Sequence, residues 1–400
     1  MNNTQTMIEK ADKFGAHNYK PLPIVLEKAQ GIWVWDVDGK KYMDMLSAYS
    51  ALNHGHRHPK IIERAKKQLD KVTLVCRAFH AEKLSLFNER ITKMTGYDMV
   101  LPMNSGAEAV ESAIKLIRKW AYLTKKIPKD KAEIIVCADN FHGRTTTIIS
   151  FSTEELYKED FGPFTPGFKI IKFGDINELK NAITPNTAAL LIEPIQAEAG
   201  INVPPKGYLK EAQKICKENN VLFVLDEIQT GMGRTGKLFC YMWDDARPDI
   251  LILGKALGGG VMPISATLAD RSIMELFKPG EHGSTFGGNP LACECALAAM
   301  DVLEDEHLVE RSNEMGEYMM NKLRGLSSPY IKEIRGKGLL IGIELKKDAG
   351  GARKFCEALM QKGLLCKETH DHVIRLAPPL IISKEELDWA FDQVKEVLTK

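Results

Sequence analysis

The stretch of the chain between residues 59 and 300 alternates between two hydrophobic patterns. Apolar residues spaced three and four positions apart predict helices at 61–69, 107–122, 209–219 and 290–303. Short continuous runs of Val, Ile and Leu predict buried strands at 133–138, 188–192, 221–225 and 250–253. This alternation is typical of an α/β fold in which helices cover a mostly parallel sheet and ligands bind where the strands end.

Outside this region the pattern changes. After Val302, charged helical segments lead to a glycine-punctuated strand at 336–345, a helix, a short strand at 373–376 and an amphipathic helix from Lys384. Near the N-terminus, alternating residues on both sides of an Asp-Gly pair predict a β-hairpin at 32–45. The predicted parts are an N-terminal arm (1–48), a large α/β domain (49–302) and a small α+β C-terminal domain (303–400).

The composition excludes several classes of protein. The 400 residues carry 54 basic and 53 acidic side chains, so the formal charge of +1 argues against a nucleic-acid partner. No uncharged apolar run approaches the roughly 18 residues of a membrane span. The first twenty residues resemble neither a signal nor a transit peptide, and we expect a cytoplasmic protein. The eight cysteines form no C-x-x-C pair, which indicates reduced thiols.

Three short motifs fit other chemistries incompletely. The glycines of 231–236 match a nicotinamide-binding fingerprint, but residues 226–230 separate them from the preceding strand and no helix signal follows. The same segment lacks the hydroxyl residue that a phosphate-binding loop needs after Lys237. The alternating histidines of 54–58 have the spacing of a zinc site on a strand, but the glycine and proline among them favour a turn. We therefore predict neither a nicotinamide site, an ATP site nor a metal site.

Two residues at predicted strand ends suggest a different chemistry. Lys255 follows strand 250–253 and is flanked by glycines, which let a flat cofactor approach the backbone. A partly desolvated lysine has a lowered pKa, which suits an amine that forms an imine. Asp226 ends the neighbouring strand and needs a cationic partner if buried, either a protonated pyridine nitrogen or a core arginine. Taken alone, the position of Lys255 fits a surface lysine at a strand end equally well.

Other residues at the same sheet edge offer binding groups. Ser105 and Glu108 have the spacing of a helix-capping box, and the helix start that follows suits a phosphate group. Phe141 could stack on a pyridine ring. Arg144 and Arg375 carry the forked guanidinium that binds carboxylates, although each could instead form a structural ion pair.

Taken in order, the segments 225–231, 254–260 and 283–290 resemble the signature series of the class III (ω-amino-acid) aminotransferases, and the similarity extends from Phe14 to the C-terminus. The resemblance implies the PLP-dependent transferase fold type I, pyridoxal 5'-phosphate (PLP) as cofactor, and a homodimer with shared active sites. It implies that Lys255 holds PLP as an imine and then moves a proton, while Asp226 keeps the ring nitrogen protonated.

The resemblance also implies the binding residues. Those for the cofactor are Ser105, Gly106, Ala107, Phe141, His142, Glu193, Asp226, Ile228, Gln229, Lys255, Ser284 and Thr285, with Ser284 and Thr285 supplied by the partner subunit. Two positions depart from relatives, in which tryptophan can replace His142 and glycine is common in place of Ala197.

Within the class, the resemblance is to members that act on L-ornithine, and it implies transfer of the δ-amino group to 2-oxoglutarate. Tyr19 and Arg144 would hold the α-carboxylate of ornithine, and Tyr49 would line the pocket. Glu198 would cover Arg375 until the second substrate binds. The alternatives are N-acetylornithine or another ω-amino acid as substrate, or a PLP-binding protein without turnover.

Overall fold

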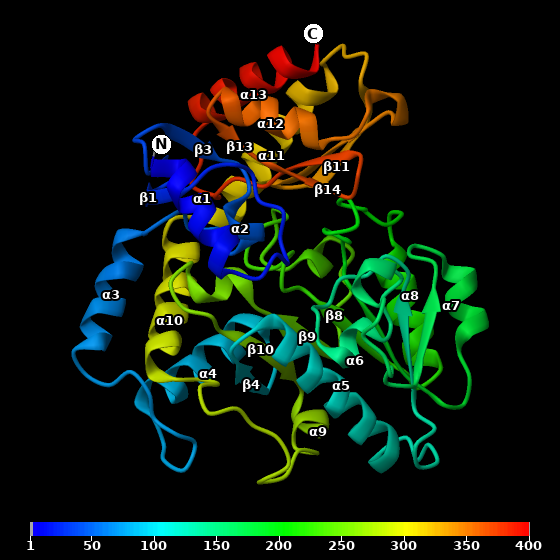
Figure 1. Ribbon diagram of the computed structural model, residues 1–400. Helices are drawn as coiled ribbons and strands as arrows, with labels where there is room; N and C mark the ends of the chain where they lie inside the picture. Colours follow the sequence, from blue (N-terminus) through cyan, green and yellow to red (C-terminus); the bar gives the residue numbers. More distant parts are fainter. Residues whose placement is uncertain (1–2, 400) are drawn as a thin grey trace.

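The computed structural model describes residues 3–399. Its centre is a seven-stranded sheet (Figure 1), in the order β4 (Met99–Met103), β10 (Ser265–Ala269), β9 (Ile250–Leu253), β8 (Leu222–Asp226), β7 (Thr187–Ile192), β5 (Glu133–Cys137) and β6 (Phe168–Ile171). Strands β9, β8, β7, β5 and β6 are parallel, and β10 is antiparallel to both of its neighbours. The four predicted strands are confirmed, whereas β4, β6 and β10 were not predicted.

Helices cover both faces of this sheet because its strands are apolar on both sides. Ile134, Val136 and Val224 pack on α5 (Gly106–Leu123), and the alternate residues of the same strands pack on the other face with α8 (Tyr208–Glu218) and α10 (Pro290–Asp305). The remaining helices of this part are α3 (Pro59–Leu69), α4 (Glu82–Thr95), α6 (Thr146–Ile149), α7 (Ile176–Ala182), α9 (Arg271–Met274) and the 3₁₀ turns η1 (Glu155–Tyr157), η2 (Cys240–Trp243) and η3 (Lys255–Gly258). The four predicted helices are confirmed within two residues at each end.

A second sheet lies near the C-terminus, in the order β11 (Ile331–Lys337), β12 (Leu340–Leu345), β15 (Val373–Leu376) and β14 (Lys367–Thr369). It is accompanied by α11 (Leu308–Arg324), η4 (Lys347–Ala349), α12 (Arg353–Gln361) and α13 (Lys384–Leu398). The single strand predicted at 336–345 is wrong, because the chain reverses at Gly338 and forms an antiparallel hairpin. Gly338 has φ +53°, and a Cβ there would lie 2.4 Å from the backbone of Thr235, so only glycine fits this turn.

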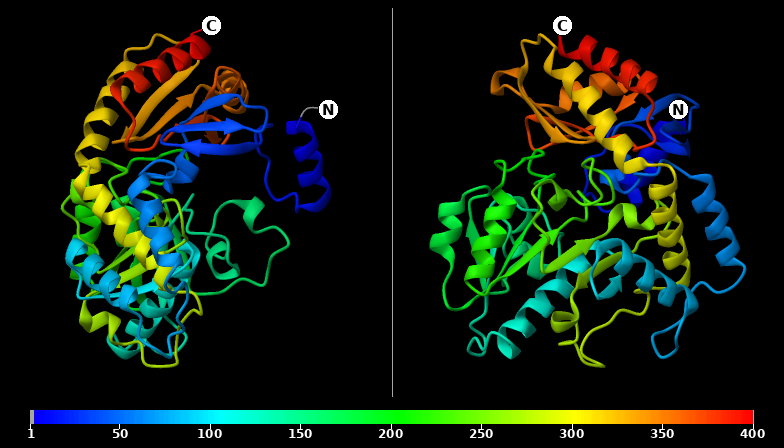
Figure 2. Two further views of the ribbon diagram at one scale, coloured as in Figure 1. Left: turned by 90° about the vertical axis from the view of Figure 1, so that its left-hand side faces the viewer. Right: turned by 180° about the vertical axis from the view of Figure 1, so that it is seen from behind.

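The N-terminal segment forms a sheet together with a short strand from the C-terminal part of the chain. After α1 (Asn3–Phe14), strands β1 (Leu26–Gln30), β2 (Trp33–Asp36) and β3 (Lys41–Asp44) form a sheet that ends in β13 (Leu364–Leu365), and α2 (Ser47–Ser50) follows. Figure 2 shows α1 standing away from the rest of the chain. The division at residues 48 and 302 stays a prediction. None of the helices in residues 3–399 is long and apolar enough to span a bilayer.

Candidate active site

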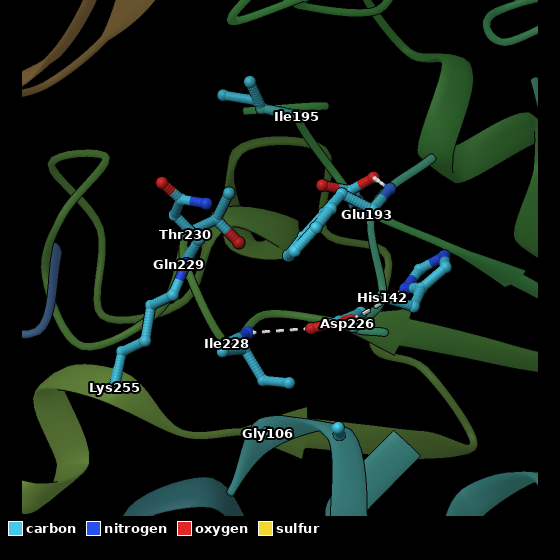
Figure 3. A pocket seen from close by; sticks show the side chains of 12 residues that line it. Gly106, His142, Glu193, Ile195, Asp226, Ile228, Gln229, Thr230 and Lys255 are labelled. Carbon is cyan, nitrogen blue, oxygen red and sulfur yellow. Dashed lines mark hydrogen bonds and ion pairs between the residues drawn. The ribbon is translucent and has the colours of Figure 1, made fainter. Parts of the chain in front are cut away.

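A cavity of about 190 Å³ lies where strands β5, β7, β8 and β9 end. The carboxyl ends of the parallel strands meet at this edge of the sheet, which is where the strand pattern predicts a ligand site. Most of the predicted cofactor-binding residues line this cavity: Gly106, Ala107, Phe141, His142, Glu193, Asp226, Ile228, Gln229 and Lys255. Figure 3 shows Lys255 on one side of Ile228 and Asp226 with His142 on the other. The sequence therefore identified the cavity, although it missed Gly143, Ile195 and Thr230 in its lining.

Lys255 occupies the position expected of a reactive amine. It lies just beyond β9, after Gly254, and is half-buried, and burial lowers its pKa to about 8. Its amine donates no hydrogen bond to any of residues 3–399. The backbone has φ +44°, a conformation that is rare for a residue with a side chain and is found at functional sites. About a tenth of this amine is therefore uncharged and nucleophilic at pH 7, far more than for an ordinary lysine.

Asp226 is the last residue of β8 and is buried. One carboxylate oxygen accepts a hydrogen bond from the backbone N–H of Ile228 at 3.0 Å, and the other accepts one from Nδ1 of His142 at 2.7 Å. Burial alone would lower the pKa of His142, but the hydrogen bond and the charge of Asp226 raise it. The partner of Asp226 is thus a histidine and not the core arginine considered from the sequence.

Glu193 lies directly after β7 and accepts a hydrogen bond from the backbone N–H of Phe141 at 2.9 Å. Burial raises its pKa to about 8. The carboxyl group is therefore largely protonated at pH 7, so it can donate a hydrogen bond into the cavity and adds little charge there.

The start of α5 has the predicted capping box. Ser105 accepts a hydrogen bond from the backbone of Glu108, whose carboxylate accepts one from the backbone of Ser105. Because N–H groups of the first turn have no partner within the helix, those of Gly106 and Ala107 are available beside the cavity. A Cβ on Gly106 would lie 2.8 Å from Ile228, so glycine keeps the backbone close to the opposite wall.

Ser284 and Thr285 do not line this cavity. Asn104 donates a side-chain hydrogen bond to the Ser284 hydroxyl at 2.8 Å, which places this loop beside the start of α5 in the same chain. Thr285 and the adjacent Phe286 are exposed. The role of Ser284 and Thr285 in a partner subunit stays a prediction.

Arg375 and Glu198 form a closed ion pair. The carboxylate accepts two hydrogen bonds from the buried guanidinium, at 2.6 and 3.0 Å, and Gln229 bridges the two side chains. Burial alone would raise the pKa of Glu198, but the charge and hydrogen bonds of Arg375 lower it to about 2. The Tyr49 ring lies 5.1 Å from the guanidinium of Arg375. The structure therefore brings together the pair expected from the sequence.

Arg144 is in a different environment. It is exposed, and none of residues 3–399 accepts a hydrogen bond from it. Three aromatic rings surround its guanidinium, at 6.0 Å for Tyr19, 5.9 Å for Phe141 and 4.4 Å for Tyr157. Tyr19 is near Arg144 as expected, whereas Tyr157 was not predicted because a tyrosine in a polar loop gives no sequence signal.

The motifs that fitted poorly have structural roles. His56 contacts Asp44 at 2.8 Å and His58 contacts Glu306, while burial lowers the pKa of His54 to about 4. No residues within 3–399 form a cluster able to hold a metal ion. The glycines of 231–236 lie in a loop that begins no helix until η2. Arg234, within that loop, is fully buried and makes four hydrogen bonds.

Comparison with known proteins identifies the family to which this cavity belongs. A family model described as class III aminotransferase matches residues 14–398. The chain belongs to the class III aminotransferases. An ornithine aminotransferase from Brevibacillus brevis is 63% identical over 398 residues, which cover 100% of this chain and 99% of that protein.

Solved structures of class III aminotransferases superimpose closely. An ornithine aminotransferase from Toxoplasma gondii, with PLP at partial occupancy in its active site, gives a TM-score of 0.98 at 44% identity, over 99% of this chain and 94% of that one. An acetylornithine aminotransferase from Elizabethkingia anophelis gives 0.91 at 47% identity, over 100% and 99%. The family and fold type I predicted from the sequence are confirmed, and the chain is a PLP-dependent aminotransferase.

Proposed function

We propose that this class III aminotransferase transfers the δ-amino group of L-ornithine to 2-oxoglutarate. The products are glutamate and glutamate 5-semialdehyde, which cyclises to pyrroline-5-carboxylate. The observation that carries the proposal is the contrast between two arginines: Glu198 forms an ion pair with Arg375, whereas no acceptor among residues 3–399 binds the N–H groups of Arg144. Relatives named ornithine aminotransferase support the same substrate.

The two arginines present two different amines to Lys255. An amino acid bound through its α-carboxylate at Arg144 extends its distal amine toward Lys255. A dicarboxylate that displaces Glu198 and binds Arg375 through its α-carboxylate presents its α-amine or α-keto group instead. The amino donor therefore binds while the Glu198–Arg375 pair is closed, and the dicarboxylate binds when the pair is open. This difference selects which end of each substrate reacts.

The cavity residues fit PLP. The free N–H groups at the start of α5 suit its phosphate, the carboxylate of Asp226 suits its ring nitrogen, and Phe141 offers a face to its ring. Glycine at position 106 lets the start of α5 approach Ile228 closely, which keeps the N–H groups of the helix at the cavity. When bound, PLP supplies an electron sink for the substrate carbon that loses its proton.

The chain's own residues perform the remaining tasks. Asp226, held by His142 and the Ile228 N–H, keeps a proton on the ring nitrogen. Lys255 would hold the cofactor through its amine, yield that position to the substrate amine and then carry the proton that the substrate carbon loses, for which its lowered pKa suits it. Gln229, Ile228 and Glu193 line the cavity and would contact the ring, and Tyr49, beside Arg375, would line the substrate side.

We further propose a cytoplasmic homodimer. Ser284 and Thr285 lie beside the start of α5 without lining the cavity, and Thr285 is exposed. These positions suit donors that reach a phosphate in a second subunit. Sedimentation of the purified protein should give a dimer, and a monomer that is fully active would contradict this assembly.

The test compares L-ornithine, N-acetylornithine and 4-aminobutyrate as amino donors with 2-oxoglutarate, by absorbance of the cofactor and identification of the products. We expect L-ornithine to react with the highest kcat/KM. The Lys255→Ala variant should bind PLP and lose turnover. A preference for N-acetylornithine, the substrate class of the rival family member, would overturn the proposal.

A further inference from the structure

Arg144 is held by aromatic faces rather than by a carboxylate. The nearest ring is that of Tyr157, whose centroid lies 4.4 Å from the guanidinium carbon. A guanidinium stacked on an aromatic face is attracted to the ring and keeps its in-plane N–H groups free. These N–H groups are the ones that a carboxylate binds in a bidentate manner.

Tyr157 also connects Arg144 with the cofactor cavity. Its ring meets the ring of Phe141 edge-on, with centroids 6.2 Å apart, and Phe141 lines the cavity. A smaller space of about 30 Å³ lies beside the cavity, and both rings line it together with Glu198. Tyr157 is therefore in contact with both the arginine and the aromatic wall of the cavity.

The loop that carries Tyr157 is fixed by local hydrogen bonds. The N–H of Tyr157 donates to the carbonyl of Glu154 at 3.0 Å, and the N–H of Glu154 donates to the hydroxyl of Ser152 at 3.1 Å. Because Ser152 is buried at the end of the preceding segment, the turn η1 has an anchored start. These bonds fix the backbone of the turn, and the edge contact with Phe141 orients the ring of Tyr157 beside Arg144.

From this arrangement we infer that Tyr157 is a positioning residue that orients Arg144 for the α-carboxylate of the amino donor, and so determines specificity for donors that react at the distal amine. The inference rests on the proposed function. It does not extend to the second half reaction, because the dicarboxylate binds Arg375, which contacts Tyr49 and Glu198 instead.

The test measures the two half reactions separately, from the absorbance of the bound cofactor, in Tyr157→Leu and Tyr157→Phe. Loss of the ring in Tyr157→Leu should raise KM for L-ornithine about tenfold, since a partly exposed cation–π contact has roughly this effect on affinity. The kcat for ornithine and the KM for glutamate should change less than about twofold. Tyr157→Phe keeps the ring and should behave like the wild type.

Leu156→Ala is the matched control, because Leu156 lies in the same turn and is exposed. It should leave both half reactions unchanged. In an Arg144→Gln background, Tyr157→Leu should have almost no further effect on ornithine, since the group it orients is gone. If Tyr157→Leu melts well below the wild type, Tyr157→Ser replaces it.

Two results would overturn the inference while the wild type still uses ornithine: an unchanged KM in Tyr157→Leu, or equal losses in both half reactions. The absence of ornithine turnover in the wild type would instead refute the proposed function.

Discussion

Replacing Glu198 by glutamine should change the balance between the two half reactions. The pKa of Glu198 falls from an ordinary 4.5 to about 2, which corresponds to about 3 kcal/mol in favour of the carboxylate. This is the excess of the attraction by Arg375, Lys255 and Gln229 over the cost of burial. A dicarboxylate must replace this attraction before it can bind Arg375. The glutamine variant is neutral and of similar size, so it lowers that barrier.

After allowance for the partial exposure of Glu198, we expect KM for glutamate to fall about 10- to 50-fold in Glu198→Gln. Ornithine should now also bind through Arg375 in the wrong orientation, so its productive half reaction should slow. Single-turnover absorbance changes with each amino acid measure both effects. An unchanged KM for glutamate, together with normal ornithine kinetics, would refute the role of the ion pair.

The same pair affects stability against pH. Because the pKa of Glu198 is lower in the folded state, its contribution is fully present above about pH 4.5 and is lost as the pH falls toward 2. In Glu198→Gln, Arg375 remains buried without a carboxylate partner, which is unfavourable. The variant should therefore have a lower free energy of unfolding than the wild type at pH 7. The difference should shrink below about pH 4.5, and denaturant unfolding at pH 7 and at acidic pH can check it.

Three further predictions follow from other contacts. His142→Phe removes the 2.7 Å hydrogen bond to Asp226 and should weaken PLP binding about tenfold, measured by titrating the apoprotein; unchanged affinity would contradict this role. Arg234→Met leaves the acceptors of four hydrogen bonds unsatisfied inside the protein and should lower the free energy of unfolding by about 3–5 kcal/mol, with denaturant unfolding as the measurement. The rate at which apoprotein takes up PLP should rise with pH and level off above about 8, since burial lowers the pKa of Lys255 and only the uncharged amine reacts; a flat profile from pH 6 to 9 would contradict this.

The predictable part of the fold is the part whose strands are buried on both faces. Strands β5, β7, β8 and β9 consist of continuous apolar runs, and their ends carry or precede Asp226 and Lys255. Strand β10, Ser-Ala-Thr-Leu-Ala, is fully buried, but it is not a continuous apolar run, because its serine and threonine hydroxyls donate hydrogen bonds to backbone carbonyls at the start of α5. Strand β4 contains Pro102 at the sheet edge, a residue that argues against a strand in sequence.

The candidate site was predictable only as far as the resemblance extends. The two proposed catalytic residues, Asp226 and Lys255, lie at or just beyond a strand end and could be identified by their neighbours in the chain. The contact between His142 and Asp226 joins residues 84 positions apart, and no local spacing indicates it. The position of Tyr157 near Arg144 depends on how the loop after α6 returns over the cavity, which a short polar sequence does not determine.

The charges around the cavity explain why one arginine is open. A charge buried without a partner is costly, so it must be paired or neutralised. Asp226 is paired with His142 and Arg375 with Glu198, while burial raises the pKa of Glu193 and lowers that of Lys255. Arg144 has no carboxylate partner in the described part of the chain, which is tolerated because it is exposed and its guanidinium lies against aromatic rings. In the proposed function, an incoming α-carboxylate would therefore meet Arg144 first, whereas a substrate would have to displace Glu198 to reach Arg375.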